Sequence, residues 1–215
     1  MELSKQYRKH THREHILSLP DTYIGSIENT SEEHYVVDGE SFKNETITPF
    51  NPGFYKLFDE LLVNAHDHVV RLKQRNSENP VKNISISVDD NVITIRNDGD
   101  SIDVETHPEY GVYIPQMIFG ELLTSTNYDK SEKKIVGGKN GYGVKLVNIF
   151  AKKLVLTVVD GTRHLKYVQT FEDSMSKVNE PTVTSCRLKP YVEISCTPDF
   201  GRFGWTTPAI PAGIL

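Results

Sequence analysis

The sequence has only two cysteines among its 215 residues, Cys186 and Cys196, and they lack the spacing of metal ligands. We therefore expect two reduced thiols in an intracellular protein. The chain also lacks the run of about 18 apolar residues that a transmembrane helix needs, and its N-terminus has no apolar secretion signal. It has no excess of basic residues, because 24 lysines and arginines face 29 acidic residues. This balance argues against strong binding of nucleic acid by the chain alone.

The periodicity of apolar residues predicts an α+β fold. Residues 54–72 have apolar side chains at the three- and four-residue spacing of a helix. Residues 83–88 and 91–96 alternate between apolar and polar, which is typical of a hairpin with one buried face. Pro115 favours a short helix over residues 113–123.

The C-terminal half predicts a lid, a helix and then strands. Residues 124–140 are polar and are expected to form a mobile lid, followed by a helix that continues to about Lys152. Three apolar segments are typical of strands: LVLTVVD, HLKYVQTF and YVEISCTP. Because helices and strands do not alternate regularly, we expect helices layered on a mixed, mostly antiparallel β-sheet.

Residues 137–150, GGKNGYGVKLVNIF, are the most informative stretch of the chain. Four glycines in seven positions precede the predicted helix, and glycine allows a ligand to approach the backbone closely. Such a loop before a helix favours binding of an anion, most often phosphate. A flexible connector is the alternative interpretation. The spacing differs from both GxxxxGK[ST] and GxGxxG, so another nucleotide-binding fold is indicated.

Three polar residues complete a candidate nucleotide site. Glu60 and Asn64 lie one turn apart on the helix predicted over residues 54–72 and project from one face. Glu60 is a candidate general base for a water molecule, and Asn64 a candidate Mg²⁺ ligand. Asn97, at the end of a predicted strand, is suited to reading the exocyclic amine of a base. The alternatives are an exposed Glu–Asn pair and a simple turn.

Five segments of the chain, in order, carry a resemblance to one protein family: EHILSLPDTYIGS at 14–26, KLFDELLVNAHDH at 56–68, IRNDG at 95–99, YIPQMIFGELLTSTNYD at 113–129 and KKIVGGKNGYGVKLVNIF at 133–150. Together they resemble the N-terminal ATPase domain of type IIA DNA topoisomerases of the eukaryotic and large-virus kind. That domain belongs to the superfamily of gyrase, heat-shock chaperones, histidine kinases and mismatch-repair proteins. The resemblance implies a Bergerat-type ATP-binding sandwich with ATP and Mg²⁺ as cofactors.

The resemblance also implies roles for individual residues. Glu60 activates water against the γ-phosphate, Asn64 binds Mg²⁺, and Asn97 recognises adenine, which Gly99 allows to approach. Tyr7 reaches the nucleotide of the partner subunit. Ser125, Thr126 and Asn127 contact the ribose and the phosphates. A second segment wraps the triphosphate and consists of Gly138, Lys139, Asn140, Gly141, Tyr142, Gly143, Val144 and Lys145.

Three positions depart from the family pattern. Asp100 and Ser101 stand where the family has a basic residue and a glycine, and His68 replaces an asparagine near the phosphates. We expect Asp100 and Ser101 to weaken ATP binding or reshape the adenine wall. We expect His68 to make nucleotide affinity pH-sensitive near neutrality. The histidines of KHTHREH are interpreted as part of a solvated arm rather than a metal site.

By resemblance the chain divides into an arm for dimer exchange (1–25), an ATP-binding domain (26–205) and an unassigned tail (206–215). The transducer domain, which supplies a Gln and a Lys to the γ-phosphate, and the cleavage domain are not recognised in the sequence. We therefore expect a fragment that binds ATP and hydrolyses it slowly or not at all.

The predicted function is an ATP-operated dimerising gate for DNA strand passage, acting at the nucleus or at a site of viral DNA replication. Its predicted partners are a second copy of the chain when ATP binds, and double-stranded DNA through the full-length enzyme. The alternatives are a non-catalytic, nucleotide-dependent dimerisation module and another ATPase of the same superfamily.

Overall fold

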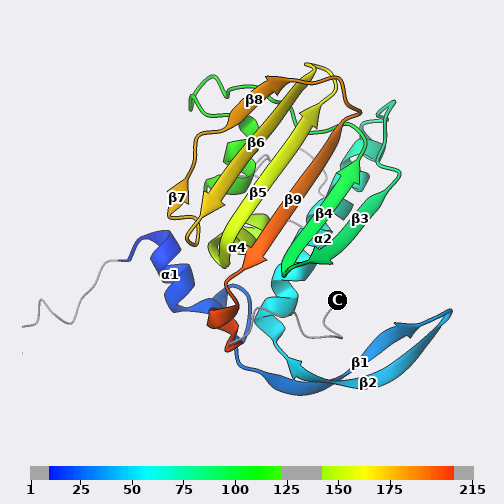
Figure 1. The fold of residues 1–215 in the computed structure, drawn as a ribbon, viewed down its shortest axis with the longest axis vertical. Coiled ribbons are helices and arrows are strands. Elements are labelled where there is room, and N and C mark those ends of the chain that lie inside the picture. The colour runs from blue at the N-terminus through cyan, green and yellow to red at the C-terminus, as the bar shows by residue number, and fades with distance from the viewer. Residues whose placement is uncertain (1–9, 123–141, 206–215) are drawn as a thin grey trace, which may run out of the picture.

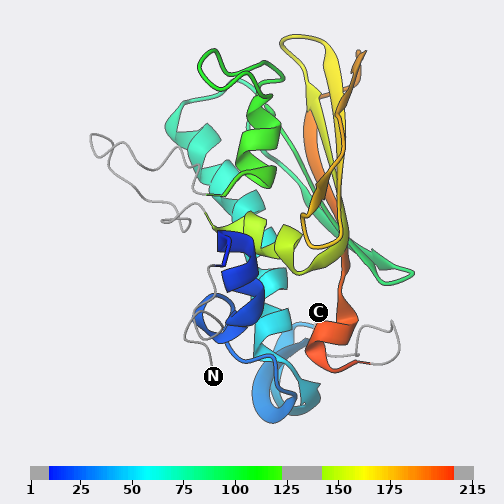
Figure 2. The ribbon, with the colours of Figure 1, turned by 90° about the vertical axis from the view of Figure 1, so that its left-hand side faces the viewer.

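The computed structural model describes residues 10–122 and 142–205, which form a layer of helices on one face of a sheet (Figures 1 and 2). In chain order the elements are α1 (His12–Ser18), η2 (Pro20–Thr22), β1 (Thr30–Asp38), β2 (Ser41–Phe50), α2 (Pro52–Gln74), β3 (Ile84–Asp89), β4 (Val92–Asp98), α3 (Ile114–Gly120), α4 (Gly143–Ile149), β5 (Ala151–Asp160), β6 (Leu165–Glu172), β7 (Lys177–Val178), β8 (Thr182–Ser185), β9 (Tyr191–Pro198) and η4 (Phe200–Phe203). The predicted α+β class is confirmed.

The main sheet has seven strands in the order β3-β4-β9-β5-β6-β7, with β8 also paired to β6. Every pairing among these strands is antiparallel. Figure 2 shows α2, α3 and α4 on one face of this sheet. β1 and β2 form a separate hairpin that projects from the body of the molecule (Figure 1).

The long helix α2 begins where the sequence provides a cap. The side chain of Asn51 accepts a hydrogen bond from the Phe54 backbone N–H at 3.0 Å, and Pro52 occupies the first turn. Leu57, Leu61 and Ala65 are buried along one stripe of the helix against the sheet. This stripe fixes which face of α2 is turned toward the interior.

The central strands alternate between the two faces of the sheet. In β4, Ile93 and Ile95 are buried under the helices, whereas Thr94 points to the other face and hydrogen-bonds Ser195 of β9 at 3.0 Å. The prediction of one buried face is confirmed for β4 but is wrong for β3, where Ile86 and Val88 are exposed. β3 is the edge strand and extends beyond the helical layer.

Several boundaries differ from the sequence-based predictions. The helix after the glycine loop ends at Ile149 rather than near Lys152, because the chain enters β5 at Ala151. Residues 12–18, expected within a solvated arm, form α1, which begins with a capping box between Thr11 and Glu14. β7 and β8 were not predicted.

Other predictions concern single features of the chain. Cys186 and Cys196 are both free thiols, and complete burial raises the pKa of Cys196 to about 12. None of the helices within residues 10–122 and 142–205 has the length and apolar character needed to cross a membrane. The predicted lid over residues 124–140 lies outside the described residues.

Replacing Asn51 by alanine should destabilise the fold by roughly 2–3 kcal/mol, because the change removes both the cap and a buried amide. That amide also donates to the Ile27 carbonyl at 2.7 Å. The control is Asn44→Ala on exposed β2, which should change stability by less than about 0.5 kcal/mol. Urea unfolding measures both changes, and equal effects would contradict the role of the cap.

Candidate functional site

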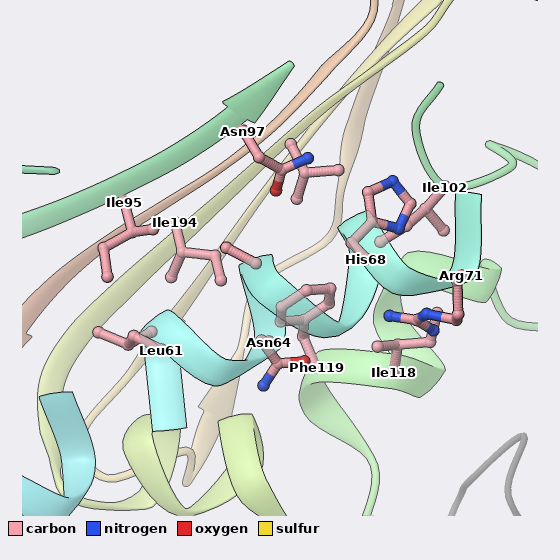
Figure 3. Close-up of a pocket in the computed structure, with 12 residues that line it drawn as sticks. Leu61, Asn64, His68, Arg71, Ile95, Asn97, Ile102, Ile118, Phe119 and Ile194 are labelled. Atoms are coloured by element: carbon pink, nitrogen blue, oxygen red, sulfur yellow. The ribbon is translucent and has the colours of Figure 1, made fainter. Parts of the chain in front are cut away.

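A cavity of about 50 Å³ lies between α2, α3 and the inner face of the sheet (Figure 3). Most of its wall is apolar, as in sites that bind flat organic groups. The residues that line it are Leu61, Asn64, Ala65, His68, Arg71, Ile95, Asn97, Ile102, Ile118, Phe119, Val192 and Ile194. The four polar members come from α2 and from the end of β4, so two elements supply the specific contacts.

Asn97 reaches from β4 towards α2 and is only 5% exposed (Figure 3). Its Nδ2 donates to the Asp98 carbonyl at 3.0 Å, which leaves Oδ1 as an acceptor at the cavity. The Asp98 carboxylate instead accepts bonds from the backbone of Lys82 and from Asn83. Burial alone would raise the pKa of Asp98, but these hydrogen bonds outweigh it and lower the pKa.

Gly99 does not line the cavity. Its φ is +88°, and a Cβ there would lie 2.7 Å from the backbone nitrogen of Val81 and 2.9 Å from the carbonyl carbon of Pro80. Packing within the protein therefore requires glycine at this position, because the end of β4 lies directly against the backbone of Pro80 and Val81.

The end of the glycine loop meets the polar face of α2. A Cβ on Gly143 would overlap Oε2 of Glu60 and would lie 3.8 Å from Nδ2 of Asn64. The other carboxylate oxygen of Glu60, Oε1, is 2.9 Å from Nζ of Lys56. Asn64 donates from Nδ2 to the Glu60 carbonyl at 3.2 Å, so its Oδ1 is the remaining acceptor. Gly143 of the predicted phosphate loop and Glu60, the predicted general base, are thus in contact although they are distant in sequence.

Lys56 is held by two carboxylates on its own helix. It contacts Asp59 and Glu60, each at 2.9 Å. Burial alone would lower the pKa of Lys56, but the two carboxylates outweigh burial and raise the pKa. Lys56 therefore stays protonated and fixes one oxygen of Glu60.

The other described residues of the predicted phosphate loop have different surroundings. Val144 is buried in the core, and Lys145 is only 2% exposed. Burial lowers the pKa of Lys145 to about 8, with Glu121 acting in the opposite direction. The Tyr142 hydroxyl lies 3.1 Å from Nε2 of His12 on α1.

The histidines of α1 are not simply solvated, which corrects the interpretation of the KHTHREH segment. The rings of His12 and Tyr142 meet edge to face with centroids 5.4 Å apart. His15 Nδ1 lies 2.9 Å from the Tyr23 hydroxyl. No cluster of metal-binding side chains is found within the described part of the chain.

Several predicted site residues lie outside the described residues: Tyr7, Ser125, Thr126, Asn127, Gly138, Lys139, Asn140 and Gly141. Their assignments stay predictions.

The three residues that depart from the family pattern, His68, Asp100 and Ser101, all form hydrogen bonds around the loop that follows β4. The Asp100 carboxylate accepts bonds from Ser77 Oγ at 2.5 Å and Asn79 Nδ2 at 3.3 Å, and Asp100 does not line the cavity. Ser101 Oγ donates to the Val159 carbonyl at 2.6 Å. His68 Nε2 donates to the Asp100 carbonyl at 2.6 Å. These residues hold the loop after β4 against α2 and β5.

Burial lowers the pKa of His68 below its ordinary value of 6.5. Arg71 and Arg75 act in the same direction, while the hydrogen bond to Asp100 and its carboxylate oppose them. This shift moves the protonation of His68 towards acid pH. The expected pH sensitivity of nucleotide affinity stays a prediction.

Sequence analysis missed two cationic residues of this region, Lys56 and Arg71. A signal for both was present, because they continue the polar strip of Glu60, Asn64 and His68 at helical spacing in both directions. Arg71 lines the cavity directly.

Comparison with known proteins identifies the class. The model of the histidine kinase-, DNA gyrase B- and HSP90-like ATPase family matches residues 51–189. The chain belongs to this ATPase family. The structure of gyrase B from Thermus thermophilus, 20% identical with a TM-score of 0.61, covers 89% of this chain and 40% of its own, and shares the fold.

Within that family the chain is similar to the ATPase region of type II DNA topoisomerases. It is 42% identical to DNA topoisomerase 2 of Arabidopsis thaliana across 95% of this chain, and 40% identical to that of Acanthamoeba polyphaga mimivirus across 94%. The solved ATPase region of Saccharomyces cerevisiae topoisomerase II superposes with a TM-score of 0.87 at 42% identity, covering 98% of this chain and 55% of its own. The chain spans 14% and 16% of the length of the two relatives.

Replacing Gly143 by alanine should displace the carboxylate of Glu60, because the new methyl group overlaps Oε2. Oε2 is the end of a flexible side chain, so the shift should change the free energy of unfolding by less than about 1 kcal/mol. Gly201→Ala is the control, since a Cβ there would meet only Asp199 Oδ1, at an ordinary 3.7 Å. Crystal structures of the two variants measure the displacement. If Glu60 Oε2 keeps its wild-type position in Gly143→Ala, the close approach of α4 to Glu60 is wrong.

The partly buried His68 should make the protein less stable in acid. Because its pKa is lower in the folded chain, the unfolded chain binds more protons, and stability falls as pH drops through 6.5 towards the folded-state value. His68→Asn should flatten the dependence of stability on pH between pH 7 and about pH 5, whereas His66→Asn at an exposed position should not. Thermal unfolding across this range tests both variants. Identical slopes in all three proteins would contradict the prediction.

Proposed function

We propose that this chain binds ATP with Mg²⁺ in the cavity beside α2 and hydrolyses its terminal phosphoanhydride bond, with Glu60 as general base. The observation that supports this best is the contact between Gly143 and Glu60. It brings Gly143, the last glycine of the loop suited to phosphate, to the α2 carboxylate that we propose activates water.

The two oxygens of Glu60 have different tasks in this proposal. Oε1 is held by Lys56 at 2.9 Å, which fixes the direction of the carboxylate. Oε2 faces Gly143 and is the oxygen that would orient a water molecule and take its proton. Positioning of this kind supplies much of the rate enhancement in phosphoryl transfer.

The donor set on α2 fits Mg²⁺ better than a metal that requires a protein cage. Mg²⁺ commonly takes one or two protein oxygens and completes its shell with phosphates and waters. Asn64 offers Oδ1, since its Nδ2 is used by the Glu60 carbonyl. When bound, the ion would neutralise charge on the phosphate oxygens.

The cavity fits the base of the nucleotide. Asn97 Oδ1 is an acceptor at a mostly apolar wall, and adenine presents an exocyclic amine as donor. Lys145 would lie with the phosphates, whose charge would favour its protonated form over the neutral form that burial favours. The base and the triphosphate would therefore occupy opposite parts of the strip along α2.

For the whole protein we propose the role of an ATP-operated gate for DNA strand passage. Binding of ATP would bring two copies together, with Tyr7 of the arm reaching the partner's nucleotide, and double-stranded DNA would be handled by the full-length enzyme. The similarity to proteins named DNA topoisomerase 2 supports this role. The alternative function is a non-catalytic dimerisation module, which would bind ATP without hydrolysing it.

Replacing Glu60 by glutamine should lower single-turnover ATP hydrolysis by roughly 100-fold or more, because the amide cannot accept the proton. Binding of a non-hydrolysable ATP analogue should persist. Asp59→Asn is the matched control, because Asp59 contacts the same Lys56 but is not the carboxylate at Gly143. It should retain at least about a third of the rate. Binding without any hydrolysis that depends on Glu60 would favour the non-catalytic module.

A further inference from the structure

Arg71 is a cation inside the cavity that the proposed chemistry does not yet use. It lies on α2 two turns beyond Asn64, and Figure 3 shows its guanidinium directed towards Ile118 and Phe119 of α3. Its Nε is buried and has no hydrogen-bond partner among the described residues. Burial lowers the pKa of Arg71, with the Asp67 carboxylate acting in the opposite direction.

A buried Nε–H with an unmet hydrogen bond is costly, since its desolvation is not compensated. His68 donates from Nε2 to the Asp100 carbonyl, and Arg71 Nε has no bond to its ring or to any other described residue. The cost disappears if a ligand in the cavity presents an acceptor to Arg71. The cavity thus offers a donor from Arg71 and an acceptor from Asn97 Oδ1.

We propose that Arg71 is a specificity-determining residue that donates a hydrogen bond to a ring nitrogen of the purine whose amine Asn97 holds. This inference rests on the proposed function. Adenine presents an amine donor beside the acceptor N1, which complements an acceptor from Asn97 and a donor from Arg71. Guanine presents an oxygen acceptor and an N–H donor at those positions, so the same pair would reject it.

The test compares Mg·ATP with its 1-deaza, 3-deaza and 7-deaza analogues by calorimetry. Wild type should bind the 1-deaza analogue roughly 10- to 100-fold more weakly than ATP, the range for a hydrogen bond from a charged donor. In Arg71→Met this difference should shrink to less than about threefold. Arg75→Met, at the exposed C-cap of the same helix, should keep it.

A second readout separates ligand binding from folding. Without nucleotide, Arg71→Met should unfold at the wild-type temperature or above, because it removes a partly buried charge with an unmet donor. Arg71→Gln provides a second variant if the methionine variant folds poorly. A difference between ATP and the deaza analogue that survives in Arg71→Met or Arg71→Gln overturns the proposal. So does equal binding of all four nucleotides by wild type. Failure of wild type to bind ATP overturns the proposed function itself.

Discussion

The absence of a side chain at Gly143 allows α4 to start against the carboxylate of Glu60, and the arrangement of the site depends on this contact. α4 is buried from Val144 to Ile149, so its position is set by packing in the core rather than by the loop before it. α2 is fixed in the same core through Leu57 and Leu61. Because protein interiors are closely packed, the core fixes the position of Gly143, at the start of α4, relative to α2.

The same region concentrates groups that a purely structural core would avoid. Lys145 is almost fully buried, and within the described part of the chain neither Arg71 Nε nor the buried Asn148 Oδ1 has a hydrogen-bond partner. Each carries a desolvation cost that packing alone does not offset. Together they lie on α2 and α4, the two helices that meet at Gly143. Functional sites commonly keep such locally unfavourable groups, with stability supplied elsewhere, here by the apolar strands β5, β6 and β9.

The sequence predicted those parts whose pattern is local. The stripe of Leu57, Leu61 and Ala65 indicates α2, and the alternation in β4 indicates a half-buried strand. It did not predict where α4 ends, because apolar residues continue without a break from the helix into β5. Arg71 was missed for a different reason. An arginine on a polar strip is usually solvated, and its burial depends on α3, which is distant in sequence.

The departures from the family motif show how a site tolerates altered residues. Asp100 would place a negative charge beside a polyanionic ligand if it faced the cavity. Its carboxylate is instead bound by Ser77 and Asn79, and Asp100 does not line the cavity. Ser101 adds a hydroxyl where a glycine is usual, and that hydroxyl bonds the Val159 carbonyl. His68 then joins α2 to the backbone of Asp100. Each of these polar groups therefore has a hydrogen-bond partner within the protein. The expected effect of Asp100 and Ser101 on ATP binding stays a prediction.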